Sequence, residues 1–179
     1  MIMRNLFYAV AAAILGTLAV ANAASGDQSP QDQTFVNAAA RGGKFEVELG
    51  KLAQQNAASA EVKQFGAEMV TDHTRLNTEL GSVATASGLT VPTDLSPQQT
   101  TKYKRLSKLS GKKFDVPYMD LMVTAHTDDL AAFQKEEAAT QNQKLKKAVA
   151  SAILVVKQHL SMAKSDSTKL NRAAIESRL

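Results

Sequence analysis

The chain has 179 residues, of which 44% are hydrophobic, 21% charged and only 5% aromatic, and it contains no cysteine. This composition indicates one helix-rich globular domain. The lack of cysteine excludes a disulfide framework, a thiolate metal site and a cysteine nucleophile, so His, Asp and Glu must supply any site chemistry. The formal net charge of +4 is too small to indicate nucleic acid as a partner.

The first 23 residues have the pattern of a secretory signal peptide. Arg4 precedes an uncharged stretch from Leu6 to Val20, and the sequence Ala-Asn-Ala that ends at Ala23 is an A-x-A cleavage site. The uncharged stretch is shorter than the roughly 20 apolar residues that span a bilayer. We therefore predict export with cleavage after Ala23, and an uncleaved membrane anchor is the alternative.

Residues 24–32 are polar and predict a flexible lead, residues 33–170 predict a helical bundle, and residues 171–179 predict a polar tail. Within the bundle, apolar residues recur at steps of three and four in four long segments, which is the period of a helix. The first segment starts this pattern at Phe35, and no segment shows the alternation of a half-buried strand.

Capping residues predict where the later helices begin. Ser59 is a candidate N-cap for the second long helix, which should end near Ser87 and Gly88. Ser96 and Gln99 form a candidate capping box for a short helix that reaches about residue 109. The third long helix is expected to have Asp115 as its N-cap, because proline is tolerated only in the first turn and residue 117 is Pro. The fourth should begin near residue 142.

Turn lengths predict the topology. Short turns near residues 57–59 and 140–142 make the first two and the last two long helices antiparallel hairpins, and a connection of roughly 27 residues joins the hairpins. The predicted fold is therefore all-α: a four-helix bundle with a long second connection that contains a short helix.

All three histidines lie on apolar helix faces. His73, His126 and His159 fall near the middle of the last three long helices, and Glu46 is central on the apolar face of the first. Neutral imidazoles and a carboxylate are ligands that Fe, Zn, Mn or Cu accept, so this set is a candidate metal site in the bundle core. Asp72 and Asp129 are candidate outer carboxylates that would orient the histidines.

A structural role is the competing interpretation of these residues. A histidine on an apolar face commonly donates its N–H to a neighbouring carboxylate, and Glu46, Asp72 and Asp129 could accept it. The sequence also lacks the Glu-x-x-His pairs of di-iron bundles. A purely structural set of histidines therefore stays open beside the metal site.

Two further features carry weaker predictions. The Gly42-Gly43 pair costs helix stability, about 1 kcal/mol per glycine relative to alanine, which indicates a close helix approach, with a ligand pocket as the alternative. A run of basic residues without an acid predicts either a solvated face or contact with an anionic envelope surface. The run comprises Lys102, Lys104, Arg105, Lys108, Lys112 and Lys113.

Ordered motifs along residues 32–164 resemble the DUF4142 family of exported bacterial proteins. They include Phe35-Val36-x-x-Ala39-x-x-Gly42-Gly43, Met69-Val70-x-Asp72-His73, Phe114-Asp115-x-x-Tyr118-Met119, Met122-Val123-x-x-His126 and His159-Leu160-x-Met162-Ala163. The resemblance implies a ferritin-like helical bundle in the bacterial envelope, usually periplasmic, with no established reaction.

The chain departs from the family pattern at two places. Ala125 stands before His126 where the family usually has Asp, which weakens any proposal that needs that carboxylate. Ile153 and Leu154 replace the usual Leu-Pro, which should leave the fourth long helix straighter.

Taken together, these features predict a periplasmic binding protein rather than an enzyme, with a divalent metal or another envelope component as its ligand. Two alternatives remain: a structural or stress-protective envelope protein, and a ferritin-like oxidoreductase with a di-metal centre.

Overall fold

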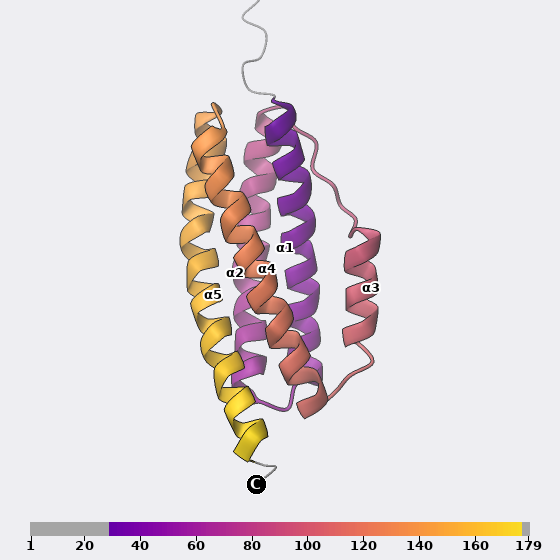
Figure 1. The fold of residues 1–179 in the computed structure, drawn as a ribbon. Helices are drawn as coiled ribbons and strands as arrows, with labels where there is room; N and C mark the ends of the chain where they lie inside the picture. The colour runs from indigo at the N-terminus through magenta and orange to yellow at the C-terminus, as the bar shows by residue number, and fades with distance from the viewer. Residues whose placement is uncertain (1–28, 177–179) are drawn as a thin grey trace, which may run out of the picture.

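The computed structural model describes residues 29–176, and these residues form five helices and no strand. The helices are α1 (Pro30–Asn56), α2 (Ala60–Ala86), α3 (Pro97–Leu106), α4 (Lys112–Ala139) and α5 (Gln143–Glu176). Four long helices lie side by side, and the short α3 lies outside them (Figure 1). The predicted all-α bundle is thus confirmed, whereas the predicted signal peptide lies outside the described residues.

The long connection between α2 and α4 runs back along the bundle (Figure 1). Helices α1 and α2 form one antiparallel hairpin and α4 and α5 form the other, so the return of the chain through α3 makes α2 and α4 parallel. Helix α2 packs on α5, and α1 packs on α4. This arrangement brings the central turns of all four long helices to one level of the interior.

Three of the predicted helix starts are confirmed by their hydrogen bonds. The hydroxyl of Ser59 accepts from the backbone N–H of Val62 at the start of α2. Ser96 and Gln99 form the reciprocal capping box of α3. The side-chain oxygen of Asn142 accepts from two backbone N–H groups in the first turn of α5. Each cap satisfies donors that the helix itself leaves unpaired.

The predicted N-cap of α4 is wrong. Asp115 lies inside the first turn, and the helix begins after Gly111, whose φ of 60° is the left-handed conformation that glycine adopts readily. The carboxylate of Asp115 instead accepts from the backbone N–H groups of Ala58 and Ser59, both at 3.0 Å, ahead of α2. Phe114 is fully buried and stacks on Tyr118, with ring centroids 5.3 Å apart, so core packing extends the helix past the expected cap.

Other boundaries differ by a few residues. Helix α1 begins at Pro30 rather than after the predicted lead, because Ser29 caps it by accepting from the N–H of Asp32. Helix α3 ends at Leu106 instead of about residue 109. Helix α5 continues to Glu176, beyond the predicted start of the polar tail.

The core consists of two apolar clusters, one toward each end of the bundle. One centres on Phe65, Met119 and Met122 near the turn between α1 and α2, and the other on Phe35 and Leu145 near the turn between α4 and α5. Between the two clusters lie the buried polar residues Glu46, His73, His126 and His159, together with apolar ones such as Leu76 and Val156. The candidate site is therefore a polar layer between two apolar layers.

Glycines permit a close approach of α1 and α2. A Cβ on Gly66 would lie 2.7 Å from the carbonyl oxygen of Gly50, and a Cβ on Gly50 would lie 2.5 Å from that of Gly66. Higher in the bundle, a Cβ on Gly43 would meet the side chain of Asn77 at 2.0 Å. Gly43 therefore fits the close approach predicted for the glycine pair, whereas a Cβ on Gly42 would meet nothing nearer than 4.0 Å.

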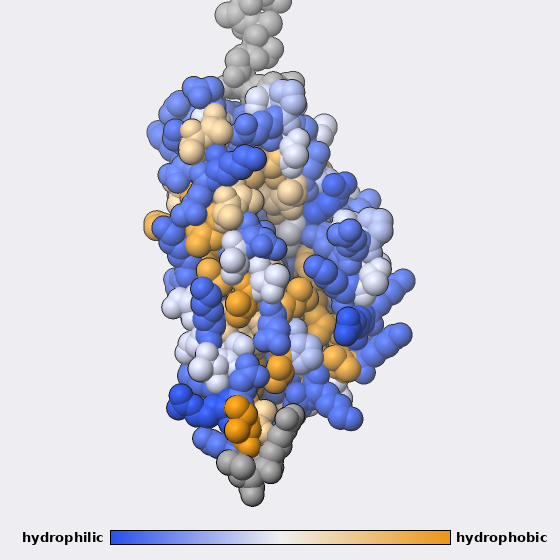
Figure 2. All heavy atoms as spheres, in the orientation of Figure 1, coloured by the Kyte–Doolittle hydropathy of each residue, from blue (hydrophilic) through white to orange (hydrophobic). Residues whose placement is uncertain are grey.

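The described surface is largely hydrophilic on the face that Figure 2 shows, with apolar side chains between charged ones. All six basic residues of the run over residues 102–113 are exposed. Among the helices of residues 29–176, none is both long and apolar enough to cross a membrane.

Candidate metal centre

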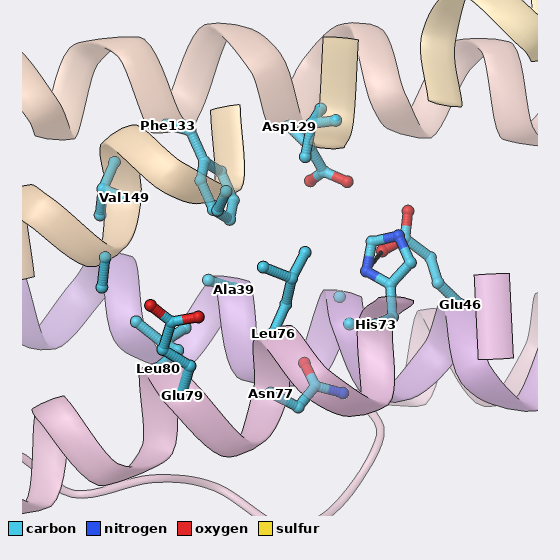
Figure 3. Close-up of a pocket in the computed structure, with 15 residues that line it drawn as sticks. Ala39, Glu46, His73, Leu76, Asn77, Glu79, Leu80, Asp129, Phe133 and Val149 are labelled. Carbon is cyan, nitrogen blue, oxygen red and sulfur yellow. Dashed lines mark ion pairs between the residues drawn. The ribbon is translucent and has the colours of Figure 1, made fainter. Parts of the chain in front are cut away.

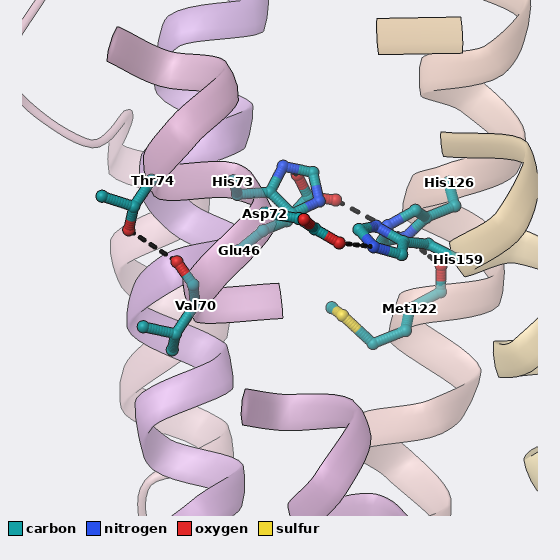
Figure 4. A network of polar contacts seen from close by, with 8 residues as sticks. All are labelled: Glu46, Val70, Asp72, His73, Thr74, Met122, His126 and His159. Atoms are coloured by element: carbon teal, nitrogen blue, oxygen red, sulfur yellow. Dashed lines mark hydrogen bonds and ion pairs between the residues drawn. The ribbon is translucent and has the colours of Figure 1, made fainter. Parts of the chain in front are cut away.

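Three histidines from three helices meet in the polar layer. His73 comes from α2, His126 from α4 and His159 from α5, and at most 4% of each residue is exposed. One ring nitrogen from each imidazole lies within 4.8 Å of those of the other two. Their ring centroids are 5.2 to 5.6 Å apart, and Figure 4 shows the three rings facing one another.

Each imidazole has one ring nitrogen close to an oxygen acceptor. Nδ1 of His73 lies 3.0 Å from Glu46 Oε2, and Nε2 of His159 donates to Asp72 Oδ2 at 3.0 Å. Nδ1 of His126 donates to the carbonyl oxygen of Met122 at 2.9 Å and lies 3.5 Å from Glu46 Oε1. These acceptors place the proton of each neutral ring on the bonded nitrogen, which leaves a lone pair on the other nitrogen.

The three remaining nitrogens have no hydrogen-bond partner among residues 29–176. They are Nε2 of His73, Nε2 of His126 and Nδ1 of His159, and all three are buried. Leaving a buried acceptor unsatisfied costs about 1–3 kcal/mol, so three unsatisfied acceptors in one small volume indicate a missing partner.

Burial keeps the three rings neutral. It lowers the pKa of His126 to about 4, with a further contribution from His159. Burial and the neighbouring imidazoles hold the pKa of His73 well below its usual range. Burial also lowers the pKa of His159, against the opposing pull of Asp72. Neutral imidazole is the form that coordinates a metal.

Two carboxyl groups lie on the α1 and α4 side of the rings. Burial raises the pKa of Glu46 well above its usual range, and the nearby carboxyl of Asp129 raises it further. Burial likewise raises the pKa of Asp129 to about 6. In Figure 3 the side chain of Asp129 points from α4 toward Glu46 and His73. A cation beside Glu46 would offset the cost of burying its charge.

An aromatic side chain closes one side of the cluster. The ring of Phe65 lies 6.4 Å from His126 and 6.3 Å from His159, centroid to centroid, and it is almost fully buried. Met122 projects across the interior below the rings (Figure 4). Water is thus kept from this side of the imidazoles.

The arrangement fits a first-row divalent metal with three nitrogen ligands. Bonds of 2.0–2.1 Å at tetrahedral angles place ligand nitrogens about 3.4 Å apart, so nitrogens that lie within 4.8 Å of one another would need to approach by up to about 1.4 Å. Metal-bound histidines almost always donate their other N–H to a carboxylate or a carbonyl; His126 and His159 do so here, and His73 Nδ1 lies 3.0 Å from the carboxylate of Glu46.

The predicted site residues fall into two groups: the histidines that form the cluster, and the carboxylates that lie beside it. The three histidines form the cluster and each has an unpartnered nitrogen, and Glu46 lies beside it, 3.0 Å from His73 Nδ1. Asp72 orients His159, on another helix, and Asp129 approaches Glu46. The sequence analysis missed the Met122 carbonyl and Phe65; a carbonyl acceptor four residues before a helical histidine is one signal that could have found the former.

Fold and site together define a four-helix bundle with a buried three-histidine cluster in its polar layer. The chain belongs to the family described as Domain of unknown function (DUF4142), which matches residues 17–165. This membership confirms the resemblance seen in the sequence motifs.

One solved structure shares the fold. The crystal structure of a DUF305 fragment from Deinococcus radiodurans superposes with a TM-score of 0.67 at 12% identity, and the match covers 80% of this chain and 97% of that chain. At this identity the likeness shows the fold alone. A comparison with curated proteins finds no match.

Proposed function

We propose that the protein binds one divalent metal ion through His73 Nε2, His126 Nε2 and His159 Nδ1. The observation that supports this most directly is that three histidines with ring nitrogens within 4.8 Å of one another each have a buried, unpartnered ring nitrogen. Glu46, Asp72 and the Met122 carbonyl orient the rings from outside. Because all three ligands are nitrogens, Cu and Zn should bind more tightly than Fe, and Mn most weakly.

A purely structural role accounts for the carboxylate partners but leaves the three lone pairs unexplained. A di-metal oxidoreductase centre needs bridging carboxylates, and the carboxylates of Glu46 and Asp72 already accept from imidazole N–H groups. The geometry therefore favours a single ion. Three ligands leave a coordination position open, which is the pattern of metal sites that take a further ligand.

The test is a melting curve of metal-stripped protein with added Cu(II), Zn(II), Fe(II) or Mn(II). Free metal at one hundred times its dissociation constant stabilises the fold by about 2.7 kcal/mol, which raises the melting temperature by about 5–11 °C for a domain of this size. The variants His73→Gln, His126→Gln and His159→Gln should each lose the shift. Met69→Leu, at a fully buried position one turn before His73, should keep it.

A structural set of histidines gives a different result. The wild-type curve would then move with none of the four ions, and each histidine variant would melt lower without any metal. That outcome would overturn the proposal.

We further propose that the protein works in the periplasm, on the basis of its signal-peptide pattern. The intact mass of protein from a periplasmic fraction should correspond to a chain that begins at Ala24. A full-length mass in the membrane fraction would contradict export with cleavage.

A further inference from the structure

A cavity of about 30 Å³ adjoins His73 of the histidine cluster. It lies between the four long helices, on the side of His73 that faces the turn between α4 and α5, whereas Phe65 closes the cluster on the other side. A cavity of this size holds a molecule of about two heavy atoms.

The walls of this cavity are mainly apolar. They include Leu76, Leu80, Phe133, Val149 and Val156. His73 and Glu46 stand together at one end of the space, with Leu76 and Phe133 further along it (Figure 3). Apolar cavities in proteins stay dry and accept uncharged apolar molecules. Polar side chains also line the space, namely Glu46, His73, Asn77, Glu79 and Asp129, so the apolar surface forms most but not all of the wall.

Gly42 keeps part of this space open. It lines the cavity, and a Cβ at this position would have ordinary contact with Asp129 Oδ1 at 4.0 Å and nothing nearer. Alanine would fit there and is a better helix former than glycine. Close packing explains Gly43, which faces Asn77, but it does not explain Gly42. The chain thus has a glycine at a position in the cavity wall where a larger side chain would occupy space next to Asp129.

We infer that this cavity binds an uncharged molecule of diatomic size, such as dioxygen or nitric oxide, next to the metal centre. The metal side of this inference rests on the proposed function, because the open position left by three histidines is where such a molecule would coordinate. Binding at the apolar walls rests on the cavity alone. The two parts can be measured separately.

The first experiment uses xenon as a steric probe of the metal-free protein. Xenon should shift the methyl NMR signals of Leu76, Val149 and Val156, and should leave the exposed Leu154 unchanged. Gly42→Val fills the cavity and should abolish the shifts. Gly81→Val makes the same substitution in α2, at a residue that does not line the cavity and where a Cβ meets nothing within 4 Å. This variant should keep the xenon-induced shifts.

The second experiment uses the loaded protein. Nitric oxide added to the Fe(II) form should give the electron paramagnetic resonance signal of a nitrosyl adduct; if iron does not bind, carbon monoxide on the Cu(I) form is read by its C–O stretch. Gly42→Val should bind the metal as tightly as the wild type and should lose the adduct. Gly81→Val should form it normally.

The outcomes separate the two proposals. If xenon shifts no methyl of the cavity, or if Gly42→Val forms the adduct as readily as the wild type, the inference is overturned while metal binding stands. If no ion binds at all, the proposed function is overturned, and with it the role of the cavity in delivering a ligand to a metal.

Discussion

The carboxylate of Glu46 on α1 lies 3.0 Å from Nδ1 of His73 on α2, and both side chains are almost completely buried. This contact fixes the ring of His73 so that Nε2 is left for another partner. It also holds a carboxyl group whose pKa is raised by burial and by Asp129. Glu46 is therefore costly to the metal-free protein and favourable to the proposed metal-bound one.

Glu46→Gln separates these two effects. The amide oxygen can still accept from His73, but the negative charge is gone, so the metal-free variant should melt higher than the wild type. Its metal affinity should fall by about 10–100-fold, which is typical when an outer partner of a metal ligand is changed. Glu48→Gln, at a residue that pairs with Lys51 on the surface, should change neither quantity. If Glu46→Gln melts at a lower temperature than the wild type and binds metal with the same affinity, Glu46 stabilises the fold and has no role in metal binding.

Asp72→Asn tests whether Asp72 orients the ring of His159 for metal binding. The amide is a weaker acceptor for the His159 N–H than the carboxylate at 3.0 Å, so metal affinity should fall by about 10–100-fold. Isothermal titration with Zn(II) measures the change. Asp120→Asn, at an exposed aspartate, is the matched control. Equal affinities for the two variants would remove Asp72 from the site.

The periodicity of the sequence was sufficient to predict the helices, because a buried face must recur every three to four residues whichever neighbour covers it. Local caps such as Ser59 were also predictable, since their partners lie within three residues. Asp115 was misassigned because its partners, Ala58 and Ser59, are more than 50 residues away. A residue that satisfies distant donors looks in the sequence like a local cap.

The candidate site was predictable in composition but not in pairing. Each histidine sits on the face that its helix buries, so their convergence follows from topology and from similar heights along the bundle. Which carboxylate contacts which ring depends on the rotation of each helix about its axis, which the sequence pattern defines only to within a broad face. For this reason the sequence predicts Glu46 as a fourth metal ligand and Asp72 as an outer carboxylate, but assigns neither to a particular ring.

A second buried carboxyl pair predicts a pH-dependent stability. Glu136 on α4 faces Asp32 on α1, and each has one buried oxygen without a partner within residues 29–176. Burial and Asp32 raise the pKa of Glu136, while Gln31, which donates to it, and Lys135 oppose the rise. A raised folded pKa means that the folded state holds the proton more tightly than the unfolded one. This contribution to stability is therefore complete below the unfolded pKa of about 4.3 and is lost as the pH rises through the folded pKa.

Glu136→Gln removes the decrease in folding stability that accompanies deprotonation of Glu136. The variant should be more stable than the wild type at pH 7, and the difference should vanish near pH 4, as measured by urea unfolding across this range. Glu137→Gln, at the next residue, is the control and should track the wild type. A stability difference that is independent of pH would contradict a raised pKa of Glu136 in the folded protein.

Two glycines of α2 should respond in opposite directions to the same change. Gly66→Ala places a methyl group 2.7 Å from a backbone oxygen of α1, which backbone packing cannot relieve easily, so the free energy of unfolding should fall by about 1–3 kcal/mol. Gly81→Ala meets nothing within 4 Å and should stabilise by about 1 kcal/mol. Chemical denaturation of both variants measures the pair. Equal effects would mean that α1 and α2 do not approach as closely as described.

The central claim is tested most directly by anomalous X-ray diffraction from crystals of the protein loaded with Zn(II) or Cu(II). The account predicts one anomalous peak about 2.0–2.1 Å from His73 Nε2, His126 Nε2 and His159 Nδ1, with Glu46 and Asp72 still bonded to the opposite ring nitrogens. A map without a peak between the three rings, or with metal only at surface residues, would contradict it.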